Sequence, residues 1–301
     1  MLDYRMNTFL TVCDTMNYRK AAELLHITQP AVTQHIQFLE KEYQCHLFLY
    51  ENRRLVKTEA ASVLEQYARA MRYNESSIRQ ELRKSSVREL KVGATKTIGD
   101  YVILDQIHHY LADPDHALTL IVDNTEHLLW LLEENQLDFA VVEGFFDKRA
   151  FESRCIRKEP FVGICRKGHP FAGRNITVEE LLNETIIHRE EGSGTRAILE
   201  QKLRGYNESL NQFRRHICIS SFKLILELVK AGLGVSFVYK VLAESAPELD
   251  TFSIQGEAIV REFNLIWLKN AHVQDKINSF FGTEKIPGPH VTNRGYPEDP
   301  A

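Results

Sequence analysis

Apolar and polar residues between positions 17 and 42 repeat at helical spacing with one interruption, which predicts two short helices joined by a tight turn. Asn17 is suited to cap the first helix, over residues 18–25, and Thr28 is suited to cap the second. Pro30 falls in the first turn of the second helix, where its missing N–H costs nothing. The segment is therefore predicted as a helical pair with defined ends.

The second helix of this pair has two chemically different sides. Val32, Ile36 and Leu39 share one side and are expected to face a core. Four polar residues then lie on the outer side of its N-terminal half: Gln29, Thr33, Gln34 and Gln37. Gln pairs with adenine at two points and Thr contacts the thymine methyl, so this side is predicted to read base edges in a major groove. The alternative is an ordinary helical hairpin with a solvated polar side.

Two further elements complete a small N-terminal unit. Residues 2–14 are predicted as a helix that packs beneath the pair, and residues 46–58 as a short hairpin, or wing. Three bases cluster in the wing, namely Arg53, Arg54 and Lys57. We expect them to contact DNA phosphates, which fix the register of a complex without reading its sequence. The alternative is a solvated turn.

The next segment predicts one long helix. From Thr58 to about residue 87 the chain contains neither Gly nor Pro, and Thr58 is suited to cap a helix. Its apolar residues follow a heptad-like rhythm: Leu64, Ala68, Met71, Ile78 and Leu82. A helix of roughly 28 residues spans about 40 Å, too long to bury this stripe on the small N-terminal unit alone. It is predicted to pair with its copy in a dimer; the alternative is a surface helix packed on its own chain.

Beyond residue 88 strands and helices alternate, which is typical of an α/β architecture with parallel strands. In a first unit we expect strands at 90–94, 117–123 and 137–142, with helices at 98–111 and 124–134. In a second unit we expect strands at 161–166, 185–189, 215–219 and 235–239, with helices at 194–204 and 221–231. A strand at 263–268 and a helix at 274–281 return the chain to the first unit. Two lobes crossed by segments near 159–162 and 262–265 predict a hinged binding cleft.

Two loops where a strand ends and a helix starts are the candidates for this cleft. One follows the first strand and the other lies in the second lobe, and both supply backbone N–H groups, hydroxyls and cations that favour an anion. The candidate binding residues are Thr95, Lys96, Thr97, Ile98, Gly144, Ser193, Gly194, Thr195 and Arg196. The alternative is a pair of helix caps with solvated cations.

Composition narrows the class of protein. The 301 residues carry a formal net charge of −4 and are 44% hydrophobic, so two or more domains are expected and overall charge does not predict nucleic-acid binding. No apolar run is long enough to span a membrane and no secretory leader is visible, so no membrane partner is expected. Five cysteines without a Cys-x-x-Cys pair argue against disulfides and a zinc site, and fit a reducing cytoplasm.

Signs of catalysis or redox chemistry are weak. The chain has no Gly-x4-Gly-Lys-Ser/Thr loop, no His-Glu-x2-His pair and no Gly-x-Ser-x-Gly turn, so neither an enzyme nor a metal site is expected. Cys155, Cys165 and Cys218 fall in predicted strands, where cysteine is usually a small buried hydrophobe. A thiol redox sensor is the less favoured alternative.

The N-terminal residues resemble the DNA-binding domain of LysR-type transcriptional regulators. The resemblance is carried by Ala21-Ala22, by Thr28-Gln29-Pro30-Ala31-Val32-Thr33, by Leu47-Phe48 and by Thr58-Glu59-Ala60. Leu49-Tyr50 departs from the family's acidic–basic pair, which removes an expected phosphate contact, and Ala61 stands where Gly is usual. The candidate DNA-binding residues are Arg19, Thr28, Gln29, Pro30, Ala31, Thr33, Gln34, Gln37, Arg53, Arg54 and Lys57.

The C-terminal part resembles the effector domain of the same family, which is itself similar to periplasmic solute-binding proteins. The matching pieces are Glu159-Pro160-Phe161, His169-Pro170-Phe171-Ala172 and the run from Val229 to Val235. The run Ser193-Gly194-Thr195-Arg196 resembles the effector loop of a branch that responds to small carboxylates or phosphorylated metabolites.

The resemblance implies an α/β multidomain protein in four segments. These are a winged helix-turn-helix over 1–58, a linker and dimerisation helix over 59–87, a two-lobed effector domain over 88–285 (lobe I 88–160 and 264–285, lobe II 161–263) and a disordered tail over 286–301. The implied function is a sequence-specific transcriptional regulator controlled by a small anionic co-inducer and needing no other cofactor. It is expected to bind a double-stranded DNA operator as a homodimer or homotetramer, and RNA polymerase, in the cytoplasm. The rival is a small-molecule-binding protein or enzyme whose N-terminal helices serve only oligomerisation.

Overall fold

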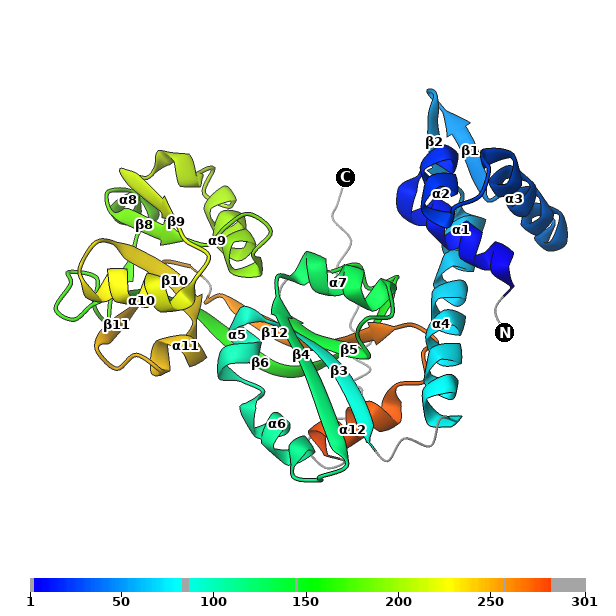
Figure 1. Ribbon diagram of the computed structural model, residues 1–301. Helices are drawn as coiled ribbons and strands as arrows, with labels where there is room; N and C mark the ends of the chain where they lie inside the picture. Colours follow the sequence, from blue (N-terminus) through cyan, green and yellow to red (C-terminus); the bar gives the residue numbers. More distant parts are fainter. Residues whose placement is uncertain (1–2, 83–86, 144–145, 257, 283–301) are drawn as a thin grey trace, which may run out of the picture.

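The computed structural model describes residues 3–82, 87–143, 146–256 and 258–282. Three parts follow one another along the chain: a small helical unit with a two-stranded wing, one long helix, and a two-lobed α/β part (Figure 1). The tail over 286–301, predicted as disordered, lies outside the described residues.

The N-terminal unit contains three helices and the wing. Its elements are α1 (Tyr4–Thr15), α2 (Tyr18–Leu25), α3 (Gln29–Tyr43), β1 (Phe48–Glu51) and β2 (Arg54–Lys57). Both predicted caps are present: the Asn17 side chain accepts a hydrogen bond from the Lys20 N–H, and Thr28 from the Ala31 N–H. The apolar sides of the helices enclose one core that includes Phe9, which is fully buried.

The long helix, α4 (Glu59–Leu82), begins as predicted, because Thr58 accepts a hydrogen bond from the Ala61 N–H. Near its start Ala61 and Ala68 join the core of the N-terminal unit. Further along, Tyr73 joins the core of the α/β part, and its hydroxyl donates to Asp138 at 2.8 Å. The helix therefore packs on both parts of its own chain.

This packing corrects the expectation of one continuous apolar stripe facing a partner. Ala68 is fully buried and Leu64 packs against the N-terminal core, because the helix turns these positions toward α1. Met71, Ile78 and Leu82 do remain exposed. Only the second half of the predicted stripe is available to a second molecule.

The first lobe is a parallel β–α–β unit to which β12 and α12, from beyond the second lobe in the sequence, are added. Its elements are β3 (Arg88–Thr95), α5 (Lys96–Tyr101), α6 (Leu104–Leu111), β4 (His116–Asp123), α7 (Thr125–Glu133), β5 (Phe139–Glu143), β12 (Val260–Leu268) and α12 (Gln274–Phe281). Strand β3 pairs in parallel with β4 and β5, as predicted. The single helix expected over 98–111 is instead two, which are separated at Val102 and Ile103, where the Ile103 side chain turns into the core.

The second lobe is built from the intervening residues. Its elements are β6 (Phe151–Arg166), β7 (Asn175–Ile176), α8 (Val178–Leu182), β8 (Thr185–His188), α9 (Gly194–Arg204), the 3-10 helix η1 (Leu210–Gln212), β9 (Arg215–Cys218), α10 (Phe222–Lys230), β10 (Val235–Tyr239), α11 (Lys240–Glu244) and β11 (Leu249–Ile254). The sequence analysis did not predict β7, α11 or β11. Strand β8 pairs in parallel with both β9 and β10.

One strand belongs to both lobes. Strand β6 begins at Phe151, earlier than predicted, because its first half carries charged residues on a partly exposed strand and so lacks an apolar signal. Up to Pro160 it pairs antiparallel with β12, and beyond that point with β10 and β11. The strand order is β4-β3-β5-β12-β6-β10-β8-β9, so the lobes are connected by a hydrogen-bonded ladder near the predicted crossing.

Candidate nucleic-acid interface and interlobe cleft

The N-terminal half of α3 presents its polar side chains to solvent. Val32, Ile36 and Leu39 are buried, as the hydrophobic pattern predicted. Gln29, Gln34 and Gln37 are exposed, and Thr33 is half-buried. Within this row the Gln29 side-chain amide donates to the Thr33 hydroxyl at 3.3 Å. A weak bond between two solvent-facing groups is easily exchanged for a bond to a base edge.

The other candidate residues at the start of α3 define the helix end itself. The Thr28 hydroxyl is engaged as the helix cap, at 3.4 Å from the Ala31 N–H. Pro30 is exposed in the first turn and Ala31 is half-buried. These three residues set the position of the helix end, while Gln29 between them points outward.

A groove of about 490 Å³ lies between the start of α2 and the wing, with Gln29 of α3 at its border. It is lined by Met16, Asn17, Tyr18, Arg19, Gln29, Tyr50, Arg53, Arg54 and Leu55. Three of the lining residues are arginines, Arg19, Arg53 and Arg54. A guanidinium group can donate two parallel hydrogen bonds to one phosphate. Tyr50 is 71% exposed and contributes a hydroxyl. The sequence analysis treated Leu49-Tyr50 as the loss of a phosphate contact. Tyr50 itself, an aromatic residue with a hydroxyl group, was the sequence signal for a different hydrogen-bond donor in the wing.

The turn of the wing is formed by residues that seldom adopt its backbone conformation. Glu51 pairs with Arg54, so the hairpin turns through Asn52 and Arg53 alone. Both have positive φ angles, +49° and +66°. This is the geometry of a type I′ turn, in which the second position favours Gly. Arg53 therefore stands at the tip of the wing in a backbone conformation that is costly for an arginine.

Two of the predicted phosphate-binding cations have partners within the chain. The Lys57 ammonium lies 2.7 Å from Glu65 on α4, and Arg19 lies 3.3 Å from Glu23. The Arg19 side chain is 87% exposed, so its bond to Glu23 is worth little in water. Lys57 is the more strongly held of the two.

In the first lobe, the candidate cleft residues surround a buried carboxyl group. Thr95, at the end of β3, donates a hydrogen bond to Glu143, at the end of β5. Burial raises the pKa of Glu143 to about 7. Thr97 is fully buried, and Ile98 belongs to the hydrophobic core of this lobe. Gly144 lies outside the described residues.

Lys96 joins the two lobes. Its ammonium donates to the Ser220 carbonyl oxygen at 3.1 Å and lies 3.5 Å from Glu190. Glu190 also accepts two hydrogen bonds from the buried Arg189, each of 2.7 Å. Burial of Glu190 favours its neutral form, but the hydrogen bonds and the two cations prevail and lower its pKa. Both cations are therefore already paired.

The start of α9 approaches the first lobe closely. A side chain on Gly194 would meet the Glu143 carbonyl oxygen at 3.2 Å, which explains a glycine at this position. The buried hydroxyls of Ser193 and Thr195 bond to each other at 2.8 Å. Ser193 makes no side-chain cap, so the first amide groups of α9 lack the usual hydroxyl acceptor. The structure thus brings the two predicted loops together.

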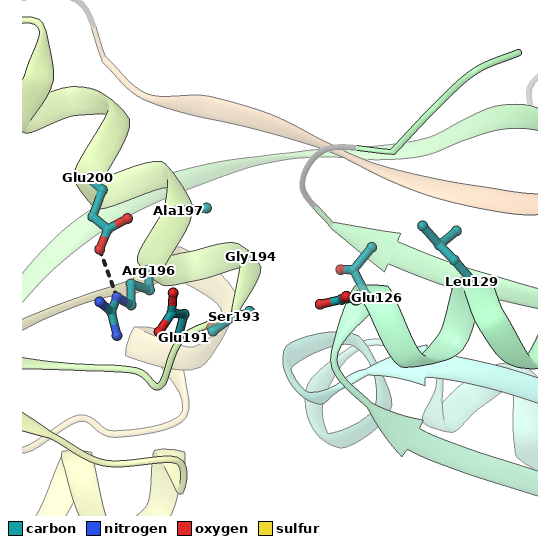
Figure 2. Close-up of a pocket in the computed structure, with 10 residues that line it drawn as sticks. Glu126, Leu129, Glu191, Ser193, Gly194, Arg196, Ala197 and Glu200 are labelled. Atoms are coloured by element: carbon teal, nitrogen blue, oxygen red, sulfur yellow. Dashed lines mark hydrogen bonds and ion pairs between the residues drawn. The ribbon is translucent and has the colours of Figure 1, made fainter. Parts of the chain in front are cut away.

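A cavity of about 400 Å³ opens between α7 and α9, one helix from each lobe (Figure 2). It is lined by Thr125, Glu126, Leu129, Glu191, Gly192, Ser193, Gly194, Arg196, Ala197 and Glu200. Arg196 donates to Glu200 at 2.7 Å, so this cation also has a partner within the chain (Figure 2). The four-residue spacing of Arg196 and Glu200 was the sequence signal for this pair.

Several carboxylates of the cleft were missed as site residues. Glu126, Glu143 and Glu200 were not among the candidate binding residues, and neither were Glu190 and Glu191 of the second-lobe loop. The first three give no local signal, because a single acidic residue is common at strand ends and on helices. Their roles follow only from the approach of the two lobes.

The cysteines are only partly as expected. Cys165 is buried, but Cys155 is half-buried and Cys218 is exposed at the edge strand β9. In the described ranges, no helix is long and apolar enough to cross a membrane. Nor do three or more His, Cys, Asp or Glu side chains of that part of the chain gather in a way that would hold a metal ion.

Comparison with known proteins gives two family matches. Residues 4–62 match the family described as bacterial regulatory helix-turn-helix protein, lysR family, and residues 83–283 match the LysR substrate binding domain. The HTH-type transcriptional regulator CysL of Bacillus subtilis is 30% identical over 282 residues, covering 91% of this chain and 88% of the relative. The RuBisCO operon transcriptional regulator of Allochromatium vinosum is 27% identical over 288 residues, covering 92% and 93%.

Solved structures share the fold. An H2O2-bound mutant of OxyR from Corynebacterium glutamicum, in which a serine replaces a cysteine, superposes with a TM-score of 0.58 at 22% identity, covering 92% of this chain and 89% of that one. The CcmR regulatory domain of Synechocystis PCC6803, in complex with 2-PG, also gives a TM-score of 0.58 at 23% identity, covering 64% and 95%.

The two family matches together span most of the chain, and the similar relatives are transcriptional regulators rather than enzymes. This decides against the rival interpretation of an enzyme with oligomerising N-terminal helices. The chain belongs to the LysR family of transcriptional regulators, with a helix-turn-helix domain at its N-terminus followed by an effector-binding domain.

Proposed function

We propose that the chain binds a two-fold symmetric operator as a homodimer, or as a tetramer built from two such dimers, and reads bases with the N-terminal half of α3. One observation supports this most directly. The row of Gln29, Thr33, Gln34 and Gln37, whose three glutamines are exposed, reaches at Gln29 a groove that is lined by three arginines. On this proposal, base-reading and phosphate-binding groups share one surface, as sequence-specific binding requires.

The dimer is supported by the exposed apolar residues of α4. Val63, Tyr67, Met71, Ile78 and Leu82 are each more than 40% exposed. A row of this size on one helix is unfavourable in water unless a second molecule covers it. Sedimentation at working concentrations tests this step, and a monomer with intact DNA affinity contradicts it. We place the activity in the cytoplasm, with RNA polymerase as the partner at promoters.

The base-reading role is tested with Gln29→Ala. Loss of a two-point contact to adenine should reduce the preference for operator over random DNA by about 1–3 kcal/mol, roughly 5- to 150-fold. Gln255→Ala, at an exposed position after β11, is the matched control and should change nothing. If Gln29→Ala keeps the full preference in a fluorescence-anisotropy titration, the assignment fails.

The effector is proposed to be a small metabolite with an acidic group, a carboxylate or a phosphate, bound between the lobes. Support comes from the uncapped amide groups at the start of α9, where Gly194 approaches Glu143 of the first lobe, and from the neighbouring hydroxyls of Ser193 and Thr195. Because Lys96 and Arg196 have internal partners, hydroxyl and amide donors are expected to carry the binding.

Two substitutions test this site. Thr97→Ala and Ser193→Ala should abolish the response of DNA binding to effector while leaving DNA affinity without effector unchanged. Candidate effectors are found by thermal shift, since a ligand at 100 times its dissociation constant stabilises the folded state by about 2.7 kcal/mol. An unchanged effector titration in both variants contradicts the assignment.

A further inference from the structure

The cavity between α7 and α9 has a charge distribution that does not suit a simple anion. Its lining contains the three carboxylates Glu126, Glu191 and Glu200 against the single guanidinium of Arg196. That guanidinium is held by Glu200 at 2.7 Å, so the pair contributes little net charge. The remaining two carboxylates line the opening from different lobes, Glu126 from the first and Glu191, beside Arg196, from the second (Figure 2).

In the described part of the chain neither of these two carboxylates forms a close ion pair; Arg196 acts on Glu191 only at longer range and is bound to Glu200. Among the residues that the structure describes, no Lys, Arg or His side chain lies within ion-pair distance of Glu126 or Glu191. Gly192 keeps the loop close to the first lobe: its φ angle of +81° favours glycine, and a side chain there would meet the Glu126 carboxylate at 4.0 Å. Two carboxylates therefore line one cleft from different lobes, and their mutual repulsion favours a cation between them.

Beside Glu191, on the same lobe, lie groups of the other polarity (Figure 2). The amide groups at the start of α9 have no side-chain cap, and the Ser193 and Thr195 hydroxyls lie beside them. These donors suit a carboxylate. Leu129 and Ala197 add a small apolar surface to the lining, sized for a short aliphatic chain. The site therefore pairs a region for a negative group with a region for a positive one.

We infer that the effector is a small zwitterion of the amino-acid class, whose ammonium group lies between Glu126 and Glu191 while its carboxylate binds the start of α9. This inference rests on the proposed effector site and narrows its ligand class. A metabolite with two negative charges and no amine would add to the unpaired negative charge of the cavity. An amine-bearing carboxylate neutralises that charge, and it joins the two lobes because Glu126 and Glu191 belong to different ones.

The test is a matched panel of ligands on the full-length protein. L-alanine, L-serine and L-aspartate are compared with L-lactate, glycerate and L-malate, in which a hydroxyl replaces the amine, and with ethylamine and ethanolamine, which lack the carboxylate. Calorimetric titration should show at least one amino acid binding about tenfold or more tightly than its hydroxy-acid partner and its amine partner.

Variants connect the preference to the two carboxylates. Glu126→Gln and Glu191→Gln should each reduce the amino-acid to hydroxy-acid ratio by about tenfold, whereas Glu152→Gln, at an exposed position of β6, should leave it unchanged. Hydroxy acids or phosphorylated dianions that bind as tightly as the amino acids overturn the inference but leave the acidic-group site standing. A panel in which no compound binds at about 10 mM contradicts both.

Discussion

The ammonium group of Lys57 in the wing lies 2.7 Å from a carboxylate oxygen of Glu65 on α4. Glu65 also accepts a hydrogen bond of 2.8 Å from Arg69. Burial of Glu65 works to raise its pKa, but its bonds with Lys57 and Arg69 prevail and lower it, so the group stays ionised. A lysine expected to bind a DNA phosphate is thus engaged by its own chain, and DNA has to compete for it.

Glu65→Gln is expected to increase DNA affinity. Removing the carboxylate releases Lys57 for a phosphate, and one additional phosphate contact should steepen the dependence of log K on log salt by about 0.9. Anisotropy titrations at several salt concentrations measure this slope. In a Lys57→Met background the same Glu65→Gln change should have no effect on affinity or slope. An equal gain in both backgrounds shows that Glu65 acts through another group.

Arg69→Ala is expected to destabilise the protein by about 3 kcal/mol. The Arg69 side chain is 5% exposed and binds Asp14 on α1, Glu65 on α4 and Glu134 after α7, so its removal leaves partly buried carboxylates without their cation. Urea denaturation measures the loss. Arg79→Ala is the control on the same helix: its side chain is 59% exposed beside Glu75, and the expected cost is under about 0.5 kcal/mol. Equal losses in both variants contradict the role of Arg69.

Arg53→Gly is expected to increase the stability of the protein and to weaken its binding to DNA. Glycine relieves the left-handed backbone at the tip of the wing, so the free energy of unfolding should rise by about 0.5–1 kcal/mol. Loss of the guanidinium should weaken binding to all DNA sequences alike and reduce the salt slope by about 1. Arg53→Lys keeps both the charge and the unfavourable φ angle of +66°, and should resemble the wild type in both measurements. If the Arg53→Gly variant is less stable than the wild type, the backbone at Arg53 is not strained.

Glu143 gives the protein a predicted pH dependence. Its pKa of about 7, above the ordinary 4.5, means that the folded state binds this proton more tightly than the unfolded chain does. The folded protein is therefore expected to lose stability as pH rises from about 4.5 through 7, by about 3 kcal/mol in total. Glu143→Gln removes the titration. It should match the wild type near pH 4, below both pKa values, and exceed it in stability at pH 8; a difference independent of pH in thermal unfolding contradicts this origin.

Local rules were sufficient for the N-terminal unit. The caps Asn17 and Thr28, the proline at the start of α3 and the buried set Val32, Ile36 and Leu39 depend on residues a few positions apart, and all were readable from the sequence. The break between α5 and α6 was not, because it depends on the core that Ile103 enters. The first half of β6 was missed for a similar reason: its charged residues hide a strand that exists through pairing with β12.

The candidate cleft shows the same division. Thr95, Ser193 and Gly194 were found because strand ends and helix starts are visible in the sequence. Their partners were not: Lys96 with Glu190 and Thr95 with Glu143 are pairs separated by 94 and 48 residues, and no local pattern joins them. The distant pair with Glu190 neutralises Lys96, one of the two cations predicted to hold an anion, whereas the other, Arg196, is neutralised locally by Glu200.

Strand β6 carries both lobes on one backbone ladder, with Pro160 opposite Val260 where it passes from one to the other. A second lobe that is cut from the chain at Phe161 would lose the pairing between β6 and β12. A first lobe that is cut at the same point would lose the continuation of β6 into the second lobe. The halves are thus not interchangeable modules: we expect them to melt in a single calorimetric transition, and any rotation that opens or shuts the cleft has to be absorbed as twist in this one ribbon.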